Sequence, residues 1–359
     1  MVLRLSFACW DYDRMKAIED GRIRPEGIEL EFLNRRVEET FFRQLRFQEF
    51  DVSELSLSSY VLTLSQDEPP FIAIPVFPSR FFRHQSMYVN SRAGIDRPQD
   101  LRGKKIGIPE YQSKSSSSGQ ESSTADSVTS ARPNFLHVLV TAAVWQRGIM
   151  EDDFAVPIDS VEFYTGAIEH SESERKSKIP HSLPKGVSVT QIPKGKNLSQ
   201  MLAEGEVDAI FSATKPSTMD TSDDVMYLFP NFKEVEADYF KRTGIFPIMH
   251  VVAIKRAVYN ANPWIAKELT KAFALALEMA YEPLNERAAL RYMLPWLESH
   301  VEETKQLMGG DSKWWKDGFE ENRHVLDRFL DYHHRQGLSK RRLRPEELFA
   351  PGTLETFVV

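Results

Sequence analysis

The sequence predicts an α/β protein of two similar lobes that face each other across a cleft, with a helical C-terminal region. Two distant stretches, residues 37–60 and 198–217, repeat one order of elements: a helix, an acidic turn, a short strand and a hydroxyl-rich loop. The chain has 359 residues, which exceeds one typical domain. The repeat and the length together favour the two-lobed arrangement.

The first part of the chain carries strand patterns on either side of one helix pattern. Alternating apolar residues predict strands at residues 2–9 and 27–33, and an unbroken apolar run predicts a buried strand at 71–76. Residues 37–45 have the spacing of a short amphipathic helix. These elements are expected to build the first lobe.

The chain is expected to cross between the lobes twice. Residues 84–89 lead out of the first lobe, and residues 243–250 lead into a strand that returns to it. We therefore assign residues 1–88 to the first lobe and 89–248 to the second. Residues 249–359 are assigned to the completion of the first lobe and to the C-terminal helices.

A serine-rich segment in the second lobe, at about residues 113–133, fits no strand or helix pattern. Its lack of apolar residues predicts a disordered surface loop. A tolerated insertion is favoured over a lid beside the cleft. A helix pattern begins near Thr141, soon after this segment.

The composition argues against several classes of function. A formal charge of −7 argues against a nucleic-acid partner. The single cysteine, Cys9, excludes an internal disulfide and a multi-cysteine metal site, and its apolar neighbours favour a buried thiol over a nucleophile. No stretch is long and apolar enough to span a membrane, and the first residues lack the pattern of an export signal. A cytoplasmic protein without nucleic-acid or membrane partners is expected.

Residues 77–84 are the strongest candidate for a binding site. They bring Arg80, Arg83 and His84 together with three phenylalanines, directly after the buried strand. Arginine offers a rigid fork of donors for a carboxylate, and aromatic faces suit a flat ring. The segment therefore suggests a pocket for a planar, anionic molecule. The alternative is a strand end whose arginines extend into solvent over a phenylalanine core.

Several motifs make the sequence similar to the 4,5-dihydroxyphthalate decarboxylase family. The similarity covers nearly the whole chain apart from the serine-rich segment, with motifs at residues 8–13, 37–42, 56–60, 77–84, 107–112, 164–166, 245–250 and 322–326. The resemblance implies a two-lobed fold like that of type II periplasmic binding proteins, turned to enzymatic use. It also implies a carboxy-lyase that converts 4,5-dihydroxyphthalate to protocatechuate and CO2.

The chain departs from the family pattern at two places. The serine-rich segment interrupts one continuous motif, and Thr214 lies in a loop where the family pattern has an arginine. This second departure leaves the substrate more open than the reaction type. One alternative is decarboxylation of a related, bulkier hydroxybenzoate-type acid. Another is a non-catalytic aromatic-acid-binding protein, which the missing export signal disfavours.

The implied reaction needs a fixed cationic clamp on the carboxylate that stays. The departing carboxylate should be held weakly, because a strong ion pair would stabilise the ground state more than the transition state. We assign the clamp to Arg80 and Arg83, with help from Ser58 or Ser59. The N-terminus of the helix near Thr141 is expected to add amide donors to the same anion.

The reaction also needs an acid near the ring carbon and a base near the phenol. His84 and His250 are the candidates, because imidazole changes charge near neutral pH. His84 is favoured since it adjoins the arginines, and Glu110 is the next candidate base. The alternatives are histidines satisfied by the backbone at a hinge and a glutamate paired with an arginine.

The remaining candidates would contact the substrate ring and its hydroxyl groups. Trp10 and Phe82 are expected to sandwich the ring, although core packing accounts for both equally well. Asp11 and Tyr12 are expected to hold a hydroxyl group, unless Asp11 only caps its loop. Thr214 is counted as a substrate-binding residue because of its place in the altered loop.

No cofactor is expected, and the expected partner is a small aromatic acid. No His-x-x-x-His or paired-cysteine spacing appears, and the side chains of the adjacent His333 and His334 diverge on a helix. A divalent metal held by distant loops would leave no sequence pattern, so it stays open. Self-association into a homo-oligomer also stays open.

Overall fold

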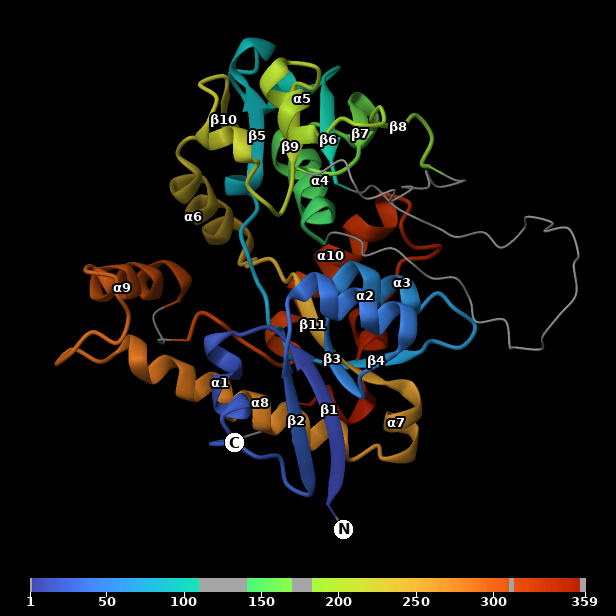
Figure 1. The fold of residues 1–359 in the computed structure, drawn as a ribbon, viewed down its shortest axis with the longest axis vertical. Helices are drawn as coiled ribbons and strands as arrows, with labels where there is room; N and C mark the ends of the chain where they lie inside the picture. The colour runs from blue at the N-terminus through green and yellow to red at the C-terminus, as the bar shows by residue number, and fades with distance from the viewer. Residues whose placement is uncertain (1, 110–140, 170–182, 310–312, 356–359) are drawn as a thin grey trace, which may run out of the picture.

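The chain builds two β-sheets, which lie at opposite ends of the molecule in Figure 1. The computed structural model describes residues 2–109, 141–169, 183–309 and 313–355. Glu110 and the serine-rich segment lie outside these ranges. The predicted α/β class, with two sheets and a helical C-terminal region, is confirmed, whereas the cleft between the lobes stays a prediction.

The lower sheet has five strands, in the spatial order β2 (Ile28–Asn34), β1 (Leu3–Cys9), β3 (Val52–Ser56), β11 (His250–Lys255) and β4 (Phe71–Ile74). β1 runs parallel to β2 and β3, and β11 runs antiparallel to β3 and β4. The register of β11 on β3 pairs His250 with Ser56. The start of β11 therefore lies at the same sheet edge as the carboxyl ends of β1 and β3.

The upper sheet has six strands, in the spatial order β10 (Val225–Tyr227), β5 (Met87–Asn90), β9 (Ala209–Phe211), β6 (Lys105–Ile108), β7 (Glu162–Thr165) and β8 (Ser188–Gln191). β6 runs parallel to β7 and β9, and β5 runs antiparallel to β9 and β10. Because β5 begins at Met87, the chain enters this sheet close to the boundary expected after residue 88. The limits of the lobes themselves stay a prediction.

The described residues form ten α-helices: α1 (Lys16–Glu19), α2 (Val37–Phe47), α3 (Leu57–Thr63), α4 (Thr141–Phe154), α5 (Leu198–Glu204), α6 (Phe232–Thr243), α7 (Arg256–Ala261), α8 (Ile265–Tyr281), α9 (Leu297–Met308) and α10 (Arg323–Arg335). The helix predicted at residues 37–45 is confirmed as α2. Asn197 caps the start of α5, and Gly205, with φ of 77°, ends it. Within the described ranges, none of these helices combines the length and the apolarity that a membrane span requires.

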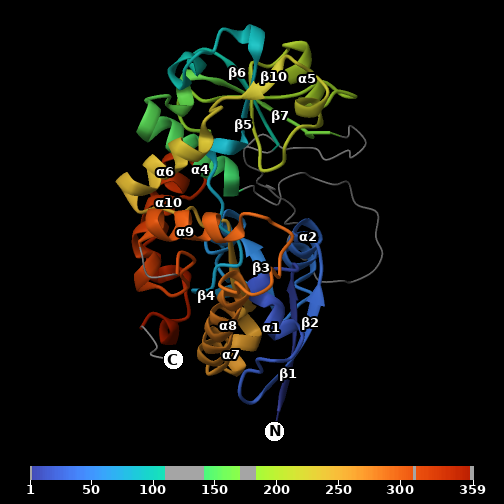
Figure 2. The same cartoon turned by 90° about the vertical axis from the view of Figure 1, so that its left-hand side faces the viewer.

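One continuous buried cluster joins the two halves of the molecule. α4, which follows the upper strand β6, packs against the C-terminal helix α10, and Figure 2 shows the two helices side by side. The indole of Trp145 lies 5.5 Å from the ring of Phe329 and 5.7 Å from that of Tyr332, and its Nε1 donates to the carbonyl of Ile248 at 2.9 Å. A Cβ at Gly148 would lie 2.2 Å from the Tyr332 ring, so only glycine fits where these helices meet.

Candidate active site

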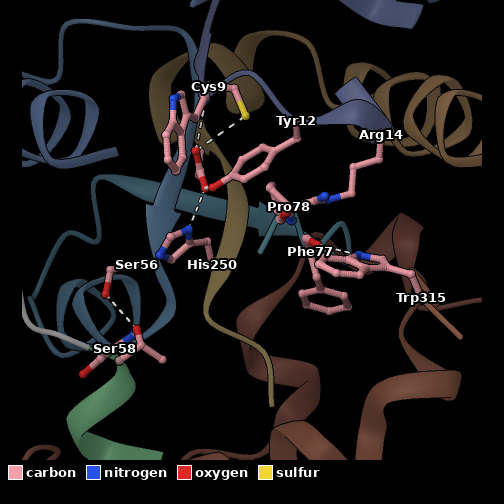
Figure 3. Close-up of polar contacts among 12 residues, drawn as sticks. Cys9, Tyr12, Arg14, Ser56, Ser58, Phe77, Pro78, His250 and Trp315 are labelled. Carbon is pink, nitrogen blue, oxygen red and sulfur yellow. Dashed lines mark hydrogen bonds and ion pairs between the residues drawn. The ribbon is translucent and has the colours of Figure 1, made fainter. Parts of the chain in front are cut away.

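A buried carboxylate, that of Glu54 on β3, lies at the centre of the candidate site. Its side chain is 0% exposed and faces four donors. The hydroxyl of Tyr12 and Nδ1 of His250 each lie 2.6 Å from Oε1. The backbone N–H of Trp10 and the thiol of Cys9 face Oε2, at 3.3 Å and 3.6 Å. Figure 3 shows Cys9, Tyr12 and His250 converging on this carboxylate.

These donors keep the Glu54 carboxylate ionised although it is buried. Burial alone would raise its pKa, but the charge and hydrogen bond of His250 and the hydrogen bonds of Tyr12 and Trp10 bring the pKa below its usual value. Burial and the nearby carboxylate raise the pKa of Tyr12, so the phenol stays a hydrogen-bond donor. Burial and Glu54 also raise the pKa of Cys9, and the prediction of a buried thiol is confirmed.

Three segments distant in sequence bring this cluster together. Tyr12 comes from the loop after β1, Glu54 from β3 and His250 from the first position of β11. Phe41 of α2 packs edge-on against the imidazole, with ring centroids 4.9 Å apart, and limits how the ring can turn. The His250 side chain is 17% exposed, and its Nε2 has no hydrogen bond to any residue that the structure describes. Nε2 is therefore the ring atom available to a ligand.

A hydroxyl cluster lies next to His250, at the N-terminal ends of α3 and α4. The hydroxyl groups of Ser56 and Thr141 are 2.8 Å apart, and Thr141 also accepts from the backbone N–H of Ser58 at 3.2 Å. The Ser58 hydroxyl lies 3.1 Å from Nε2 of His333, and the backbone N–H of Ser59 donates to Ser56 at 3.4 Å. The structure thus brings the predicted residues Ser58, Ser59 and Thr141 together. Helix N-termini at this edge favour a negatively charged group.

Arg83 has the features expected of a carboxylate clamp. Its Nε donates to the sulfur of Met249 at 3.1 Å, and its guanidinium carbon lies 4.7 Å from the centroid of the Phe81 ring. Its two terminal nitrogens make no hydrogen bond to any residue within the described ranges. Burial lowers the pKa of Arg83 to about 9, so the group stays mostly charged at neutral pH. Because Met249 directly precedes His250, Arg83 lies near the start of β11.

Arg80 is held differently, because protein oxygens already occupy its terminal nitrogens. One nitrogen donates to the carbonyl of Phe246 at 3.1 Å, and the other to the carbonyl of Lys316 at 2.6 Å and to the side chain of Asn322. Arg80 therefore joins the crossing between the lobes to the C-terminal region. The structure does not bring its donors to the candidate site.

His84 lies in a different environment from His250. Its ring is 1% exposed and lies 5.2–6.4 Å from the rings of Phe154, Phe229 and Tyr239. Burial lowers its pKa to about 4, so the ring is neutral at ordinary pH. The nearest carboxylate oxygen, that of Glu236, lies 3.9 Å from Nδ1. The structure does not place His84 with the Glu54 cluster.

The two aromatic candidates are also separated. Trp10 is 45% exposed, and its ring lies edge-on to Tyr12 at 5.8 Å, so it stands at the rim of the Glu54 cluster. Phe82 instead stacks on Phe246, with ring centroids 4.7 Å apart. A protein ring therefore already covers one face of Phe82. A substrate ring sandwiched between Trp10 and Phe82 stays a prediction.

The remaining candidates lie at the surface or outside the described residues. Asp11 is exposed and lies 3.5 Å from the ammonium group of Lys16. Thr214 is exposed in the loop after β9, and its backbone N–H donates to the hydroxyl of Ser212 at 3.0 Å. Glu110, the candidate base, lies outside the described residues.

Sequence reasoning missed Glu54 and Arg14. A single carboxylate inside the fully buried strand β3 was the available signal for Glu54. The guanidinium carbon of Arg14 lies 4.2 Å from the ring centroid of Tyr12 and 4.1 Å from that of Trp315, and its Nε donates to the carbonyl of Pro78 at 2.6 Å (Figure 3). No sequence pattern connects these residues, because Trp315 comes from the C-terminal region.

Across the described residues, no group of three or more histidine, cysteine, aspartate or glutamate side chains is arranged to hold a metal ion. Groups that do converge, such as Glu54 with His250, are bonded to one another instead.

Comparison of folds defines the class of protein. A periplasmic sulfonate-binding protein from Methylobacillus flagellatus matches with a TM-score of 0.52 and 12% sequence identity, over 98% of this chain and 93% of that chain. At this identity the likeness shows the fold alone, and it confirms the predicted periplasmic-binding-protein-like architecture. No protein-family model matches the sequence.

Two curated relatives then identify the family. The 4,5-dihydroxyphthalate decarboxylase of Comamonas testosteroni is 38% identical over 358 residues, which cover 99% of each chain. The enzyme of the same name from Pseudomonas putida is 35% identical over 240 residues, which cover 67% of this chain and 82% of the relative. The chain belongs to the 4,5-dihydroxyphthalate decarboxylase family, a family of carboxy-lyases, and the resemblance read from its motifs is confirmed.

Proposed function

We propose that this chain removes CO2 from 4,5-dihydroxyphthalate to give protocatechuate. The observation that carries the proposal is the 38% identity to the Comamonas testosteroni decarboxylase over 99% of both chains. The site supports it, because a histidine oriented by a buried carboxylate lies at a sheet edge beside a cluster of hydroxyl groups. No observation favours the alternative substrates or a non-catalytic role.

The substrate chemistry requires a proton donor at a ring carbon. Direct loss of CO2 would leave an aryl anion in an orbital that the ring cannot delocalise. A hydroxyl group para to the departing carboxylate opens another route, in which the ring carbon gains a proton while the phenol loses one. The carbon–carbon electron pair then returns to the ring as CO2 leaves, and the phenol regains its proton. In sum, the substrate consumes one proton and releases one CO2.

His250 is the residue that best fits the proton donor. Its Nδ1 is held by Glu54 at 2.6 Å, and its Nε2 has no hydrogen-bond partner among the described residues. A protonated imidazole in this position would deliver its Nε2 proton to the ring carbon and regain one from solvent. The acid role, which sequence order gave first to His84, therefore passes to His250. Glu110 stays the predicted base for the phenol.

Arg83 best fits the clamp on the carboxylate that stays. Its two terminal nitrogens are free to form the paired hydrogen bonds that a carboxylate accepts from a guanidinium. Ser58, Ser59 and Thr141 lie at the helix N-termini beside His250 and would help to hold the same anion. Arg80 is left out of the clamp because its terminal nitrogens bind protein oxygens.

Incubation of the purified protein with 4,5-dihydroxyphthalate tests the proposal. We expect protocatechuate and CO2 to appear in equal amounts, without added cofactor. Tight binding without turnover would favour an aromatic-acid-binding protein instead. Turnover of larger hydroxybenzoates, with none of 4,5-dihydroxyphthalate, would favour the bulkier substrate class. A cytoplasmic location and self-association stay predictions.

A further inference from the structure

The orientation of the His250 ring is set by a single oxygen atom. Oε1 of Glu54 lies 2.6 Å from Nδ1 of His250 and 2.6 Å from the hydroxyl of Tyr12. The side chain of Glu54 is wholly buried, whereas that of His250 reaches the surface. The carboxylate therefore contacts the imidazole from its buried side.

We propose that Glu54 is a positioning residue for the decarboxylation, which holds His250 in the one tautomer that leaves Nε2 as the reacting atom. This inference rests on the proposed function. Tyr12 has a supporting part, because its hydroxyl donates to the same oxygen and fixes the carboxylate. Neither Glu54 nor Tyr12 needs to touch the substrate for this role.

The tautomer follows from hydrogen-bond chemistry. An ionised carboxylate only accepts hydrogen bonds, so Nδ1 of His250 must carry a hydrogen whenever the 2.6 Å contact exists. In the neutral ring, Nε2 is then the unprotonated nitrogen and can take a proton from solvent. In the charged ring, Nε2 carries that proton and can pass it to a ring carbon. Each turnover uses one proton, and only Nε2 exchanges it.

The surrounding groups make the carboxylate suited to this role. A buried charge is costly unless it is paired and hydrogen-bonded, and here donors face both oxygens of Glu54. The titratable or charged groups that face the pair are Cys9 and Tyr12 around the end of β1 and Arg14 in the turn beyond, while α2 presents the uncharged ring of Phe41. Arg14 in turn packs over the Tyr12 ring at 4.2 Å. The buried charge of Glu54 is therefore both paired and hydrogen-bonded.

The variant Glu54→Gln tests this inference, because it keeps the size of the side chain and removes its charge. We expect kcat to fall by at least ~100-fold, because a histidine in the wrong tautomer loses its contribution as a general acid. KM should change little. A loss of kcat of less than about tenfold would overturn the inference.

Two further variants separate positioning from general damage. Glu29→Gln removes an exposed carboxylate of β2 that pairs with Arg4, and we expect wild-type kcat and an unmoved pH profile. Tyr12→Phe removes one hydrogen bond to Glu54 but no charge. It should lower kcat by a smaller factor than Glu54→Gln. A larger loss of kcat in Tyr12→Phe than in Glu54→Gln would contradict the supporting part assigned to Tyr12.

A spectroscopic measurement tests the tautomer without any variant or turnover. In nitrogen-15 spectra of the histidine-labelled wild type, we expect Nδ1 of His250 to carry a hydrogen in both the neutral and the charged ring, and Nε2 to carry one only in the charged ring. A neutral ring protonated at Nε2 would overturn the inference. A wild type that shows the expected tautomer but does not convert 4,5-dihydroxyphthalate would instead contradict the proposed function alone.

Discussion

His84 and His250 lie at the two crossings between the sheets, yet their surroundings are opposite. His84 is enclosed by aromatic rings, and burial lowers its pKa to about 4. His250 has a buried carboxylate at one ring nitrogen, and its other ring nitrogen makes no hydrogen bond to any described residue. The comparison teaches that proximity to arginines in sequence does not make a histidine an acid. We propose the acid role for His250 because a hydrogen-bond partner, Glu54, orients its ring.

The same contrast separates two arginines that lie three positions apart. Arg80 binds the carbonyls of Phe246 and Lys316, so it stabilises the crossing itself. Arg83 keeps its terminal nitrogens free of described partners and packs against Met249, directly before His250. We therefore propose a site role for His250 and Arg83, which lie at or next to the start of β11, and a structural role for His84 and Arg80.

The sharpest test of the histidine comparison is His250→Gln. Loss of the proton donor should lower kcat by about 10²–10⁴-fold, while substrate affinity stays near that of the wild type. Steady-state kinetics and calorimetric titration with 4,5-dihydroxyphthalate measure the two quantities separately. A kcat within tenfold of the wild-type value would show that a residue other than His250 is the acid.

Arg83→Met is expected to have the next largest effect. Removal of a charge-assisted pair of hydrogen bonds, worth about 1.5–3 kcal/mol, should raise the dissociation constant for substrate by about 10- to 150-fold. The effect on kcat should be smaller. The matched variant Arg80→Met should instead lower the free energy of unfolding, because the carbonyls of Phe246 and Lys316 lose their donor. An equal loss of substrate affinity in both variants would show that the two arginines do not have the different roles proposed here.

His84→Phe should leave kcat and KM close to those of the wild type and change the pH dependence of stability. Burial lowers the pKa of His84 from 6.5 to about 4, so the folded state prefers the neutral ring. In the wild type, the stability that the neutral ring contributes is fully present above pH 6.5. The free energy of unfolding then falls as the pH drops from 6.5 toward 4. At about 1.4 kcal/mol per pH unit, the loss approaches ~3 kcal/mol, and the variant should lack it.

Denaturant unfolding at neutral and acidic pH measures this effect for His84→Phe. His300→Gln is the matched control, because the His300 side chain is 49% exposed and should not change the pH dependence. An identical loss of stability toward acidic pH in the wild type and in His84→Phe would show that His84 is not buried as a neutral ring.

Thr214→Arg should have the smallest effect. It restores the arginine of the family pattern, but Thr214 is exposed in the loop after β9. An exposed charge contributes about 0–1 kcal/mol, so KM should change by less than about fivefold. A fall in KM well beyond that range would place this loop in contact with the substrate.

The sequence predicted the regular elements and the family, but only part of the site. The alternation of apolar and polar residues predicted β1 and β2, because successive side chains of a strand point to opposite faces of the sheet. The motif at residues 245–250 identified His250 as a candidate. Glu54 was missed because its role depends on partners from two other segments, which only the sheet register brings together. Arg80 and Arg83 were both assigned to the clamp, because their closeness in sequence does not show which of their nitrogens form hydrogen bonds within the protein.

Receptors of this architecture capture their ligands by swinging two halves about a hinge. In this chain the indole of Trp145 reaches from one half into the hydrophobic interior of the other, and Gly148 lets Tyr332 come into contact with the same helix. A wide swing would pull these rings into water, at about 25 cal/mol for each Å² of apolar surface exposed. Entry of substrate and escape of CO2 should therefore depend on small local movements around the rim, with the acid and its counter-ion held in place throughout turnover.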